Sequence, residues 1–258
     1  MAAPRDFFDA REKWGEIREL PSASGFDLDA AYALELEIVR LREAAGYPAV
    51  GRKVAFANQA MWRILDIQTV AWAHMFEDTV HFAREGVADV SVGRYRSPKI
   101  EPEIVMKLRD PFLHNGLASV EWIALGFEIV DSPYPTWEFQ PADFVAAWGF
   151  HAGLVVGEPL PVTSASMDDI ANQLADFRLS LLRNNEFVEA GEGRNCLRSP
   201  ALCLAELAQA AAHRGDPLQP GEIISTGSLT SAQPITAGQE WRAELNGLPL
   251  KSLRVQFS

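Results

Sequence analysis

Apolar residues are spaced as in helices near the start of the chain and as in strands over most of the rest. Residues 5–45 carry a broad apolar stripe at helical spacing, with Asp29 as the expected cap and Gly46 as the expected stop. From about residue 50 onwards, short apolar runs separated by glycine and proline predict strands. Further helices are expected over residues 141–150 and 199–213. The whole pattern predicts an α+β fold.

The change of pattern divides the chain into two parts. Residues 1–48 are the expected N-terminal helical region, and residues 49–258 are the expected larger part, a mixed core with much β-structure. Within the larger part, residues 177–189 alternate on both sides of Asn184 and Asn185, a pair suited to positive φ. This stretch therefore predicts a β-hairpin.

Two predicted strands place carboxylates among apolar residues. An extended strand sends alternate side chains to one face, and in residues 98–104 that face carries Glu101 and Glu103. Glu128 follows in residues 126–131, a segment too apolar for a surface strand. Two carboxylates about 5 Å apart repel by about 3 kcal/mol at an effective dielectric of roughly 20, so a partly buried pair needs protons or a cation. The pattern indicates either three ligands for Mg2+ or Mn2+, or simply a solvated strand face.

The composition is that of an ordinary globular protein with an acidic surface. Of the 258 residues, 48% are hydrophobic and 22% are charged, and the formal net charge is -12. This excess of negative charge argues against nucleic acid as a partner. Neither a signal-peptide pattern nor a run of about 18 apolar residues occurs, so we expect no membrane partner and a cytoplasmic location. Cys196 and Cys203 match neither a redox pair nor a zinc site and are expected to be buried, reduced thiols.

Motifs for other chemistries are incomplete or missing. The sequence contains no full dinucleotide-binding loop, no phosphate-binding loop with its lysine, and no nucleophile elbow. Lys53 lies in an otherwise apolar strand, where it is either a proton donor near an anion or a lysine at a strand edge. Residues 226–231 concentrate hydroxyl groups at a turn, which either present donors to a substrate carboxylate or form a plain Ser/Thr turn.

Several segments, taken in order, carry a family resemblance. They are residues 31–33 (AYA), 51–54 (GRKV), 98–104 (PKIEPEI), 128–132 (EIVDS) and 221–230 (GEIISTGSLT). Residues 20–258 as a whole resemble the hydratase and decarboxylase branch of the fumarylacetoacetase superfamily, which includes 2-keto-4-pentenoate (2-hydroxypenta-2,4-dienoate) hydratases and 4-oxalocrotonate decarboxylases. The resemblance implies a mixed, mostly antiparallel rolled β-sheet with flanking helices, and residues 49–258 as the catalytic domain.

The resemblance also implies a metal-dependent activity. Glu101, Glu103 and Glu128 would hold Mg2+ or Mn2+, which would chelate the enolate of a small 2-oxo or 2-hydroxydienoic acid. The expected function is that of a hydro-lyase, a hydratase of 2-hydroxy-2,4-dienoate or 2-oxo-4-enoate type acids, in a homo-oligomer. The alternatives are a 2-oxo acid decarboxylase, a hydrolase of carbon–carbon bonds, and a catalytically silent relative that binds a metabolite.

Other positions either match the family pattern or depart from it. Lys53 matches the active-site lysine, which would assist proton transfer or stabilise the enolate oxygen, and Ser228 and Thr230 match a hydroxyl loop at the substrate. Ala71 stands where the relatives usually carry an active-site aspartate. Residues 146–150 read AAWGF where the usual sequence is ADNAS. These changes remove two polar groups and add volume.

Two histidines lie beside the replaced segments. His74 and His151 both have apolar neighbours in the sequence, which is typical of histidines satisfied within a core. Their positions also make them the candidates to supply the missing acid or base. We therefore take both as catalytic candidates together with Lys53.

Overall fold

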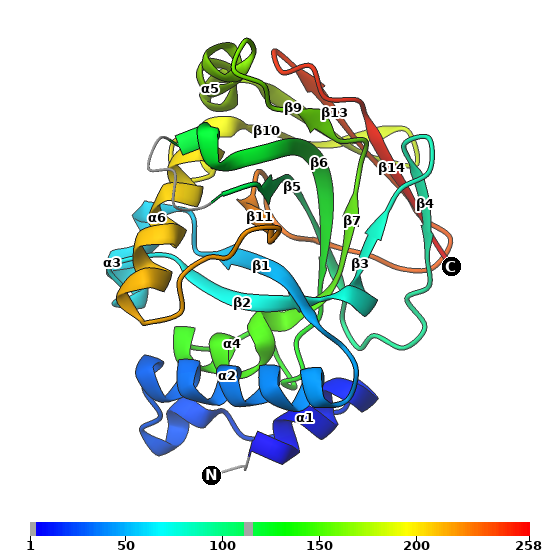
Figure 1. Ribbon diagram of the computed structural model, residues 1–258. Helices are drawn as coiled ribbons and strands as arrows, with labels where there is room; N and C mark the ends of the chain where they lie inside the picture. Colours follow the sequence, from blue (N-terminus) through cyan, green and yellow to red (C-terminus); the bar gives the residue numbers. More distant parts are fainter. Residues whose placement is uncertain (1–3, 111–115) are drawn as a thin grey trace.

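Two curled β-sheets make up most of the protein (Figure 1). The computed structural model describes residues 4–110 and 116–258. Within these ranges, the larger sheet has nine strands: β1 (Ala49–Ala55), β2 (Ala71–Phe76), β3 (Val80–Phe82), β5 (Lys99–Leu108), β6 (Val120–Val130), β7 (His151–Val156), β8 (Leu160–Pro161), β11 (Ile223–Ser228) and β12 (Gln233–Pro234). The smaller sheet has five: β4 (Val87–Val90), β9 (Arg178–Arg183), β10 (Glu186–Glu192), β13 (Glu240–Asn246) and β14 (Leu253–Phe257).

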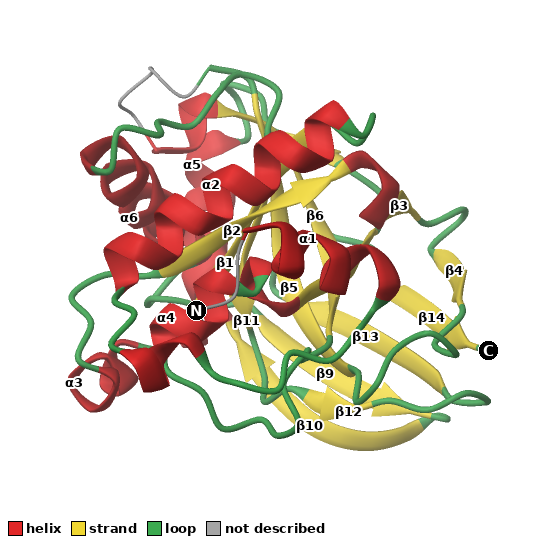
Figure 2. Cartoon of the chain, turned by 90° about the horizontal axis from the view of Figure 1, so that it is seen from below, coloured by secondary structure: helices red, strands yellow, loops and turns green. Residues whose placement is uncertain are grey.

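Helices cover one side and one end of the larger sheet (Figures 1 and 2). The α-helices in the described residues are α1 (Pro4–Lys13), α2 (Leu28–Ala44), α3 (Trp62–Leu65), α4 (Pro141–Ala146), α5 (Met167–Asp176) and α6 (Pro200–His213). The 3-10 turns are η1 (Pro21–Ser24), η2 (Gln59–Met61), η3 (Glu77–Thr79), η4 (Gly116–Ser119), η5 (Trp148–Phe150) and η6 (Gly193–Asn195). Helix α4 packs against both α2 and β2, and α6 packs against β11.

The pairing of the strands confirms the predicted α+β fold with a mostly antiparallel sheet. The main strand order in the larger sheet is β2-β1-β11-β5-β6-β7-β3, and of these pairs only β1–β11 and β3–β7 run parallel in the described part of the chain. In the register between β5 and β6, Glu101 lies opposite Glu128 and Glu103 lies opposite Gly126. Strand β1 places Lys53 opposite Ser225 of β11, one strand away from β5. The register therefore gathers the carboxylates and Lys53 at the middle of the sheet.

Several predicted elements are confirmed. Strands β9 and β10 form the expected hairpin, with φ of 51° at Asn184 and 65° at Asn185. Helix α6 begins after Ser199, whose hydroxyl accepts a hydrogen bond from the backbone N–H of Ala201 at 3.3 Å. Both cysteines are buried and free, as expected.

The prediction of helix over residues 5–45 with Asp29 as a cap is wrong in detail. The chain leaves the helical conformation after α1 and passes through η1, which Gly25 ends with a φ of 74°. Helix α2 then begins after Asp27, whose side chain accepts a hydrogen bond from the backbone N–H of Ala30. Asp27 is the cap because its backbone is extended, whereas Asp29 already lies inside the helix.

Helix α2 fastens the N-terminal helices to the edge of the larger sheet. The Tyr32 hydroxyl accepts a hydrogen bond from the backbone N–H of Trp72 at 3.1 Å, and the Glu35 carboxylate accepts one from the backbone N–H of His74 at 2.8 Å. Seen from below in Figure 2, α2 crosses over β1 and β2, and α1 packs beside α2. The division into two parts at residues 1–48 and 49–258 stays a prediction.

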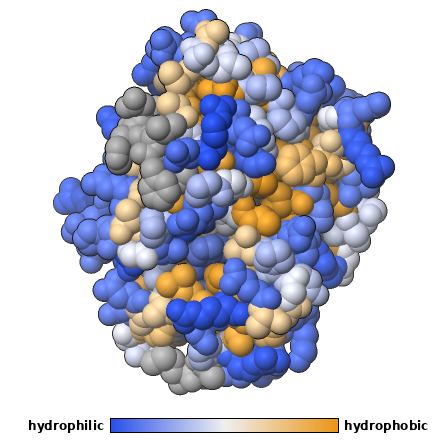
Figure 3. All heavy atoms as spheres, in the orientation of Figure 1, coloured by the Kyte–Doolittle hydropathy of each residue, from blue (hydrophilic) through white to orange (hydrophobic). Residues whose placement is uncertain are grey.

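The face of the molecule seen in Figure 3 is predominantly polar. Hydrophilic side chains cover most of the face seen in Figure 3, with smaller hydrophobic areas between them. Among the described residues, the large apolar side chains that are exposed include Ile64, Phe82 and Phe187. None of the described helices has the length and apolar character needed to cross a membrane.

Candidate functional site

The predicted acidic triad is formed by two neighbouring strands. Strand β5 contributes Glu101 and Glu103, and β6 contributes Glu128 from the position opposite Glu101. One carboxylate oxygen from each residue lies within 4.8 Å of the other two. Glu103 and Glu128 are buried and Glu101 is half-buried. Three carboxylates this close together in the interior need positive charge or protons.

Lys53 supplies part of that positive charge. Its Nζ atom lies 3.0 Å from Oε2 of Glu128, and its side chain is 2% exposed. Burial by itself would lower the pKa of Lys53, but the nearby charges of Glu128, Glu101 and Glu103 raise it above the ordinary value. Lys53 is therefore a charged ammonium group in the cluster.

One ammonium group does not balance three carboxylates. Burial raises the pKa of Glu101 to about 7 and that of Glu128 to about 7, although Lys53 opposes both shifts. Burial and the two neighbouring carboxylates raise the pKa of Glu103 further. At neutral pH the cluster alone would hold protons in place of some of its negative charge.

The donor set fits a hard divalent cation. Carboxylate oxygens are the ligands that Mg2+ and Mn2+ prefer, and a divalent ion with Lys53 would balance three ionised carboxylates. Oε2 of Glu128 is buried and, within the described part of the chain, lies 3.0 Å from the Lys53 ammonium group. A carboxylate oxygen has two lone pairs, so the same atom can also act as a metal ligand. The residues present are those that a metal would require.

A β-bulge in β11 holds Glu103. Oε2 of Glu103 accepts hydrogen bonds from the Ser225 hydroxyl and from the backbone N–H of Gly227, the latter at 3.1 Å. Gly227 has a φ of 103°, and a Cβ atom there would lie 2.9 Å from the Cβ of Ala57. Both observations require glycine at this position, because another residue would be strained and would collide with its neighbour.

His151 holds Glu128 from behind. Its Nδ1 lies 2.9 Å from Oε1 of Glu128, and its Nε2 lies 3.1 Å from the Thr79 hydroxyl. Burial, together with the charges of Arg11 and Lys53, lowers the pKa of His151 well below its ordinary value. The ring is therefore neutral, and it fixes the direction of one carboxylate oxygen while the other faces Lys53.

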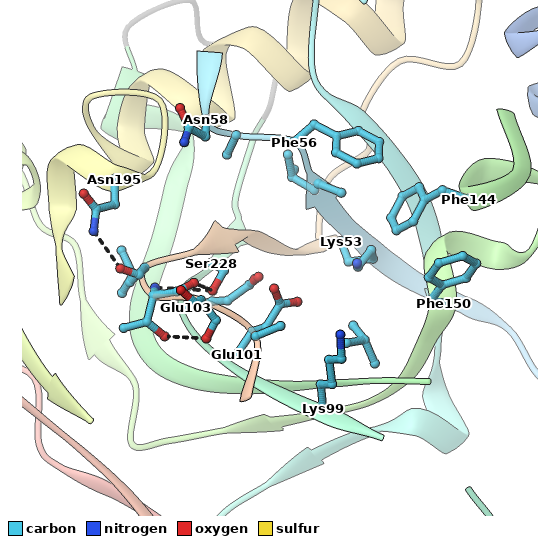
Figure 4. A pocket seen from close by; sticks show the side chains of 18 of the residues that line it. Lys53, Phe56, Asn58, Lys99, Glu101, Glu103, Phe144, Phe150, Asn195 and Ser228 are labelled. Atoms are coloured by element: carbon cyan, nitrogen blue, oxygen red, sulfur yellow. Dashed lines mark hydrogen bonds between the residues drawn. The ribbon is translucent and has the colours of Figure 1, made fainter. Parts of the chain in front are cut away.

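Two residues of the triad, Glu101 and Glu103, lie at the wall of a cavity of about 640 Å³ (Figure 4), while the buried Glu128 pairs with Lys53, which also lines the cavity. Glu101, Glu103, Lys53 and Lys99 line its charged part together with Ser228. The opposite part is apolar, and Figure 4 shows Phe56, Phe144 and Phe150 pointing into this side. We call the following five residues the aromatic wall: Phe56, Trp137, Phe139, Phe144 and Phe150.

The structure brings most of the predicted site residues together. Lys53, Ser228 and Thr230 line the cavity, and His151 contacts Glu128 without lining the cavity. In the present conformation the Ser228 hydroxyl donates a hydrogen bond to the backbone oxygen of Thr230 at 2.7 Å. The two hydroxyl-bearing residues thus belong to one turn beside the triad.

His74 is not part of this assembly. On β2 it lies opposite Arg52, whereas the neighbouring residue Ala73 lies opposite Lys53. Successive side chains alternate across a strand, so His74 faces away from Lys53. Its Nδ1 lies 2.9 Å from Oε1 of Glu35, and its Nε2 lies 3.7 Å from Oδ2 of Asp216. The neighbouring carboxylate of Glu35 overcomes the effect of burial and raises the pKa of His74.

Sequence reasoning missed two parts of the cavity. Lys99 lies on the same face of β5 as Glu101 and Glu103, so the alternation that found the glutamates also marks Lys99. The aromatic wall comes from the segment after β1, the segment after β6, and α4 with η5. No local pattern in the sequence links these segments, because the fold alone brings them together.

The fold and the site define a known class of protein. The chain belongs to the fumarylacetoacetate (FAA) hydrolase C-terminal family, whose model matches residues 60–256. This confirms the resemblance that the sequence motifs indicated.

The similar proteins include both hydratases and decarboxylases. The chain is 27% identical over 233 residues to 2-hydroxyhexa-2,4-dienoate hydratase of Comamonas testosteroni, covering 88% of this chain and 86% of the relative. It is 30% identical over 230 residues to 4-oxalocrotonate decarboxylase of Pseudomonas sp. (strain CF600), covering 87% of this chain and 84% of the relative. The structure of 4-oxalocrotonate decarboxylase from Pseudomonas putida G7, complexed with magnesium and adipate, matches with a TM-score of 0.88 at 23% identity, covering 99% of this chain and 95% of the other. The structural match shows that the fold is shared.

Proposed function

We propose that this protein is a divalent-metal-dependent hydro-lyase that hydrates small 2-hydroxy-2,4-dienoate or 2-oxo-4-enoate acids. The observation that carries the proposal is the cluster of Glu101, Glu103 and Glu128 with Lys53, in which Glu101, Glu103 and Lys53 line a cavity of about 640 Å³. The relatives named as hydratases support the choice of reaction.

Glu101, Glu103 and Glu128 are the proposed ligands of Mg2+ or Mn2+. When bound, such an ion acts as a Lewis acid toward the carboxylate and the 2-oxygen of the substrate. Glu103 would be kept in place by the β-bulge at Gly227, and Glu128 by His151. His151 thus has a positioning role in this proposal, since it touches the triad from outside the cavity.

Lys53 is the proposed group that stabilises or protonates the substrate. Its Nζ faces the cavity beside the triad, where a positive charge favours an enolate over the neutral keto acid. Ser228 and Thr230 would present hydroxyl groups to the substrate carboxylate. His74 is left out of the proposed mechanism because its side chain lies on the other face of β2.

Decarboxylation of a 2-oxo acid is the second candidate. Hydration needs a group that delivers a proton and positions water, and Ala71, on the same face of β2 as Ala73, provides no such group. Decarboxylation needs an electron sink and one later protonation, which Lys53 beside a metal can support. A relative at 30% identity is named as a decarboxylase of this kind.

The products distinguish the candidates. The protein is incubated with 2-hydroxypenta-2,4-dienoate or a 4-oxalocrotonate-type dicarboxylic acid, with and without Mg2+ or Mn2+, and the products are identified by NMR. A hydroxylated 2-oxo acid that forms only with metal supports the hydratase, and loss of carbon dioxide supports the second candidate. Metal-dependent binding without any product would mean a silent metabolite-binding protein. If the protein neither binds nor converts any of these acids, the proposal is refuted.

A matched pair of variants tests the role of the triad. Glu103→Gln should lower turnover by about 100-fold or more, because a neutral amide replaces a charged ligand. The control is Glu121→Gln on β6, whose side chain is half exposed and pairs with Lys107 at 3.6 Å, away from the cavity. The control should leave turnover at the level of the unmodified protein.

A further inference from the structure

The aromatic wall is a continuous apolar surface. Ring centroids lie 5.0 Å apart for Phe56 and Phe144, 5.1 Å apart for Phe144 and Phe150, and 4.7 Å apart for Phe139 and Phe150. The last two pairs meet edge to face, the geometry that aromatic rings prefer. Trp137 joins the group with its ring 5.8 Å from that of Phe150. The wall can therefore receive a flat apolar group at low cost.

Some side chains of the aromatic wall are not fully buried in the protein core. Phe56, Phe139 and Trp137 are each half-buried although they line the cavity. Apolar surface left open inside a cavity is typical of a binding site for an apolar group. The ring surfaces that face the cavity are thus available to a ligand.

Two rings of the aromatic wall belong to residues with a strained backbone conformation. Phe56 has a φ of 58° and Phe150 has a φ of 56°, in a region that bulky residues rarely adopt. Trp148 and Gly149, directly before Phe150, also have positive φ, of 47° and 63°. Strained residues of this kind gather at binding sites. The positions of the rings are therefore held by the surrounding structure.

The charged part and the aromatic wall meet within the same cavity. The Nζ of Lys53 lies 4.8 Å from the ring centroid of Phe144, and the Nζ of Lys99 lies 3.8 Å from that of Trp137. A molecule with its acid group near the lysines and the triad would direct its other end to the rings. A cavity of about 640 Å³ lies in the range of roughly 300–1,000 Å³ that accommodates drug-sized ligands. A short-chain dienoic acid would leave much of this space to water.

We infer that the substrate is an acid whose 2-oxo or 2-hydroxydienoate end is followed by a bulky apolar tail, best an aryl group, which packs against the aromatic wall. This inference rests on the proposed function, because the triad and Lys53 set the orientation of the acid end. A tail with a second carboxylate is disfavoured, since the wall offers it no hydrogen bond and would desolvate its charge.

Binding of unreactive analogues tests the inference apart from turnover. With saturating Mg2+, calorimetry compares 2-oxobutanoate, 2-oxo-4-phenylbutanoate and 2-oxohexanedioate, none of which has the double bond that hydration needs. The phenyl acid should bind at least about tenfold more tightly than either of the others, a difference of about 1.4 kcal/mol. Equal binding of 2-oxobutanoate and the phenyl acid, or tighter binding of the dicarboxylate, overturns the inference.

Variants show whether the wall is responsible. Phe139→Ala removes a half-buried ring of the wall and should reduce the ratio of the two affinities, phenyl acid to 2-oxobutanoate, by about fivefold or more. The control is Phe187→Ala on β10, a residue that is 65% exposed and outside the cavity, which should keep the original ratio. An unchanged ratio in Phe139→Ala overturns the inference even if the unmodified protein prefers the phenyl acid.

The two proposals can fail separately. If the dienoate is hydrated but the phenyl group brings no gain in affinity, the proposed function stands and the inference about the tail is wrong. If no 2-oxo acid binds in the presence of metal and no dienoate is converted, the proposed function fails, and the inference fails with it.

Discussion

Replacing Lys53 by methionine should destabilise the metal-free protein, because it removes a positive charge from the cluster of carboxylates. The substitution keeps an unbranched side chain, one heavy atom shorter, but removes an ammonium group that lies 3.0 Å from Oε2 of Glu128. At this distance and an effective dielectric of roughly 20, the attraction between the two charges is about 5 kcal/mol. Removing one partner of a buried pair costs about 3–5 kcal/mol in measured cases. We therefore expect a loss of about 3–5 kcal/mol in the free energy of unfolding at pH 8.

The loss should depend on pH in a defined direction. Folding raises the pKa values of Glu101 and Glu128 from 4.5 to about 7, so between these values the folded state binds more protons than the unfolded state. The contribution of the cluster to the stability of the metal-free protein then falls as the pH rises through this window. Without Lys53 the carboxyl pKa values rise further, and the fall becomes steeper. The effect of Lys53→Met should be large at pH 8 and small near pH 4.5, where the carboxyl groups are protonated.

The assay is urea unfolding in the presence of EDTA at several pH values between 4.5 and 8. Lys107→Met is the matched control, because Lys107 also lies on a strand of the larger sheet but pairs with Glu121 at 3.6 Å in a half-exposed position. A pair of that kind contributes about 0–1 kcal/mol, so the control should show a small loss at every pH. If Lys53→Met loses the same stability at pH 5 and at pH 8, the loss comes from packing, and the charge argument is refuted.

Three further predictions concern the metal and its supports. Affinity for Mn2+, measured by calorimetry, should fall by about tenfold or more from pH 8 to pH 5.5, since protons compete at Glu101 and Glu128; an affinity independent of pH would contradict this. Gly227→Ala should cost about 1–3 kcal/mol in urea unfolding, because alanine is strained at a φ of 103°, and full stability would show that the β-bulge can relax. His151→Gln should weaken Mn2+ binding by about 10–100-fold, whereas His74→Gln should keep it within about twofold; equal effects would remove the distinction between the two histidines.

The parts of the fold and site that follow from short-range patterns were predictable. The alternation of side chains placed Glu101 and Glu103 on one face, and the apolar neighbours of Glu128 marked a buried strand. The pair Asn184 and Asn185 gave the hairpin, because both residues tolerate positive φ. In each case the residues that decide the structure are neighbours in the sequence.

Features that depend on strand register or on distant segments were not predictable. His74 and His151 have similar neighbours in the sequence, yet the pairing of β1 with β2 turns His74 toward Glu35 on the far face. The choice of Asp27 over Asp29 as the helix cap depends on where the chain leaves η1. The aromatic wall is assembled from three separate segments, so no periodic pattern in the sequence predicts it. Local sequence patterns indicate which side chains can take part in catalysis or binding, and the tertiary fold determines which of them lie close together.

Charge balance connects the triad with the choice of substrate. Three ionised carboxylates and Lys53 leave two negative charges, which one divalent cation neutralises, so a bound acid adds its own negative charge to a neutral site. Lys99 is the side chain placed to offset this charge, since it lines the cavity beside Glu101. Burial lowers the pKa of Lys99, and an incoming anion would raise it again. Glu189 also lines the cavity and adds a negative charge, so a second carboxylate on the substrate would meet no further cation among the lining residues, which favours a monocarboxylic acid with an uncharged tail.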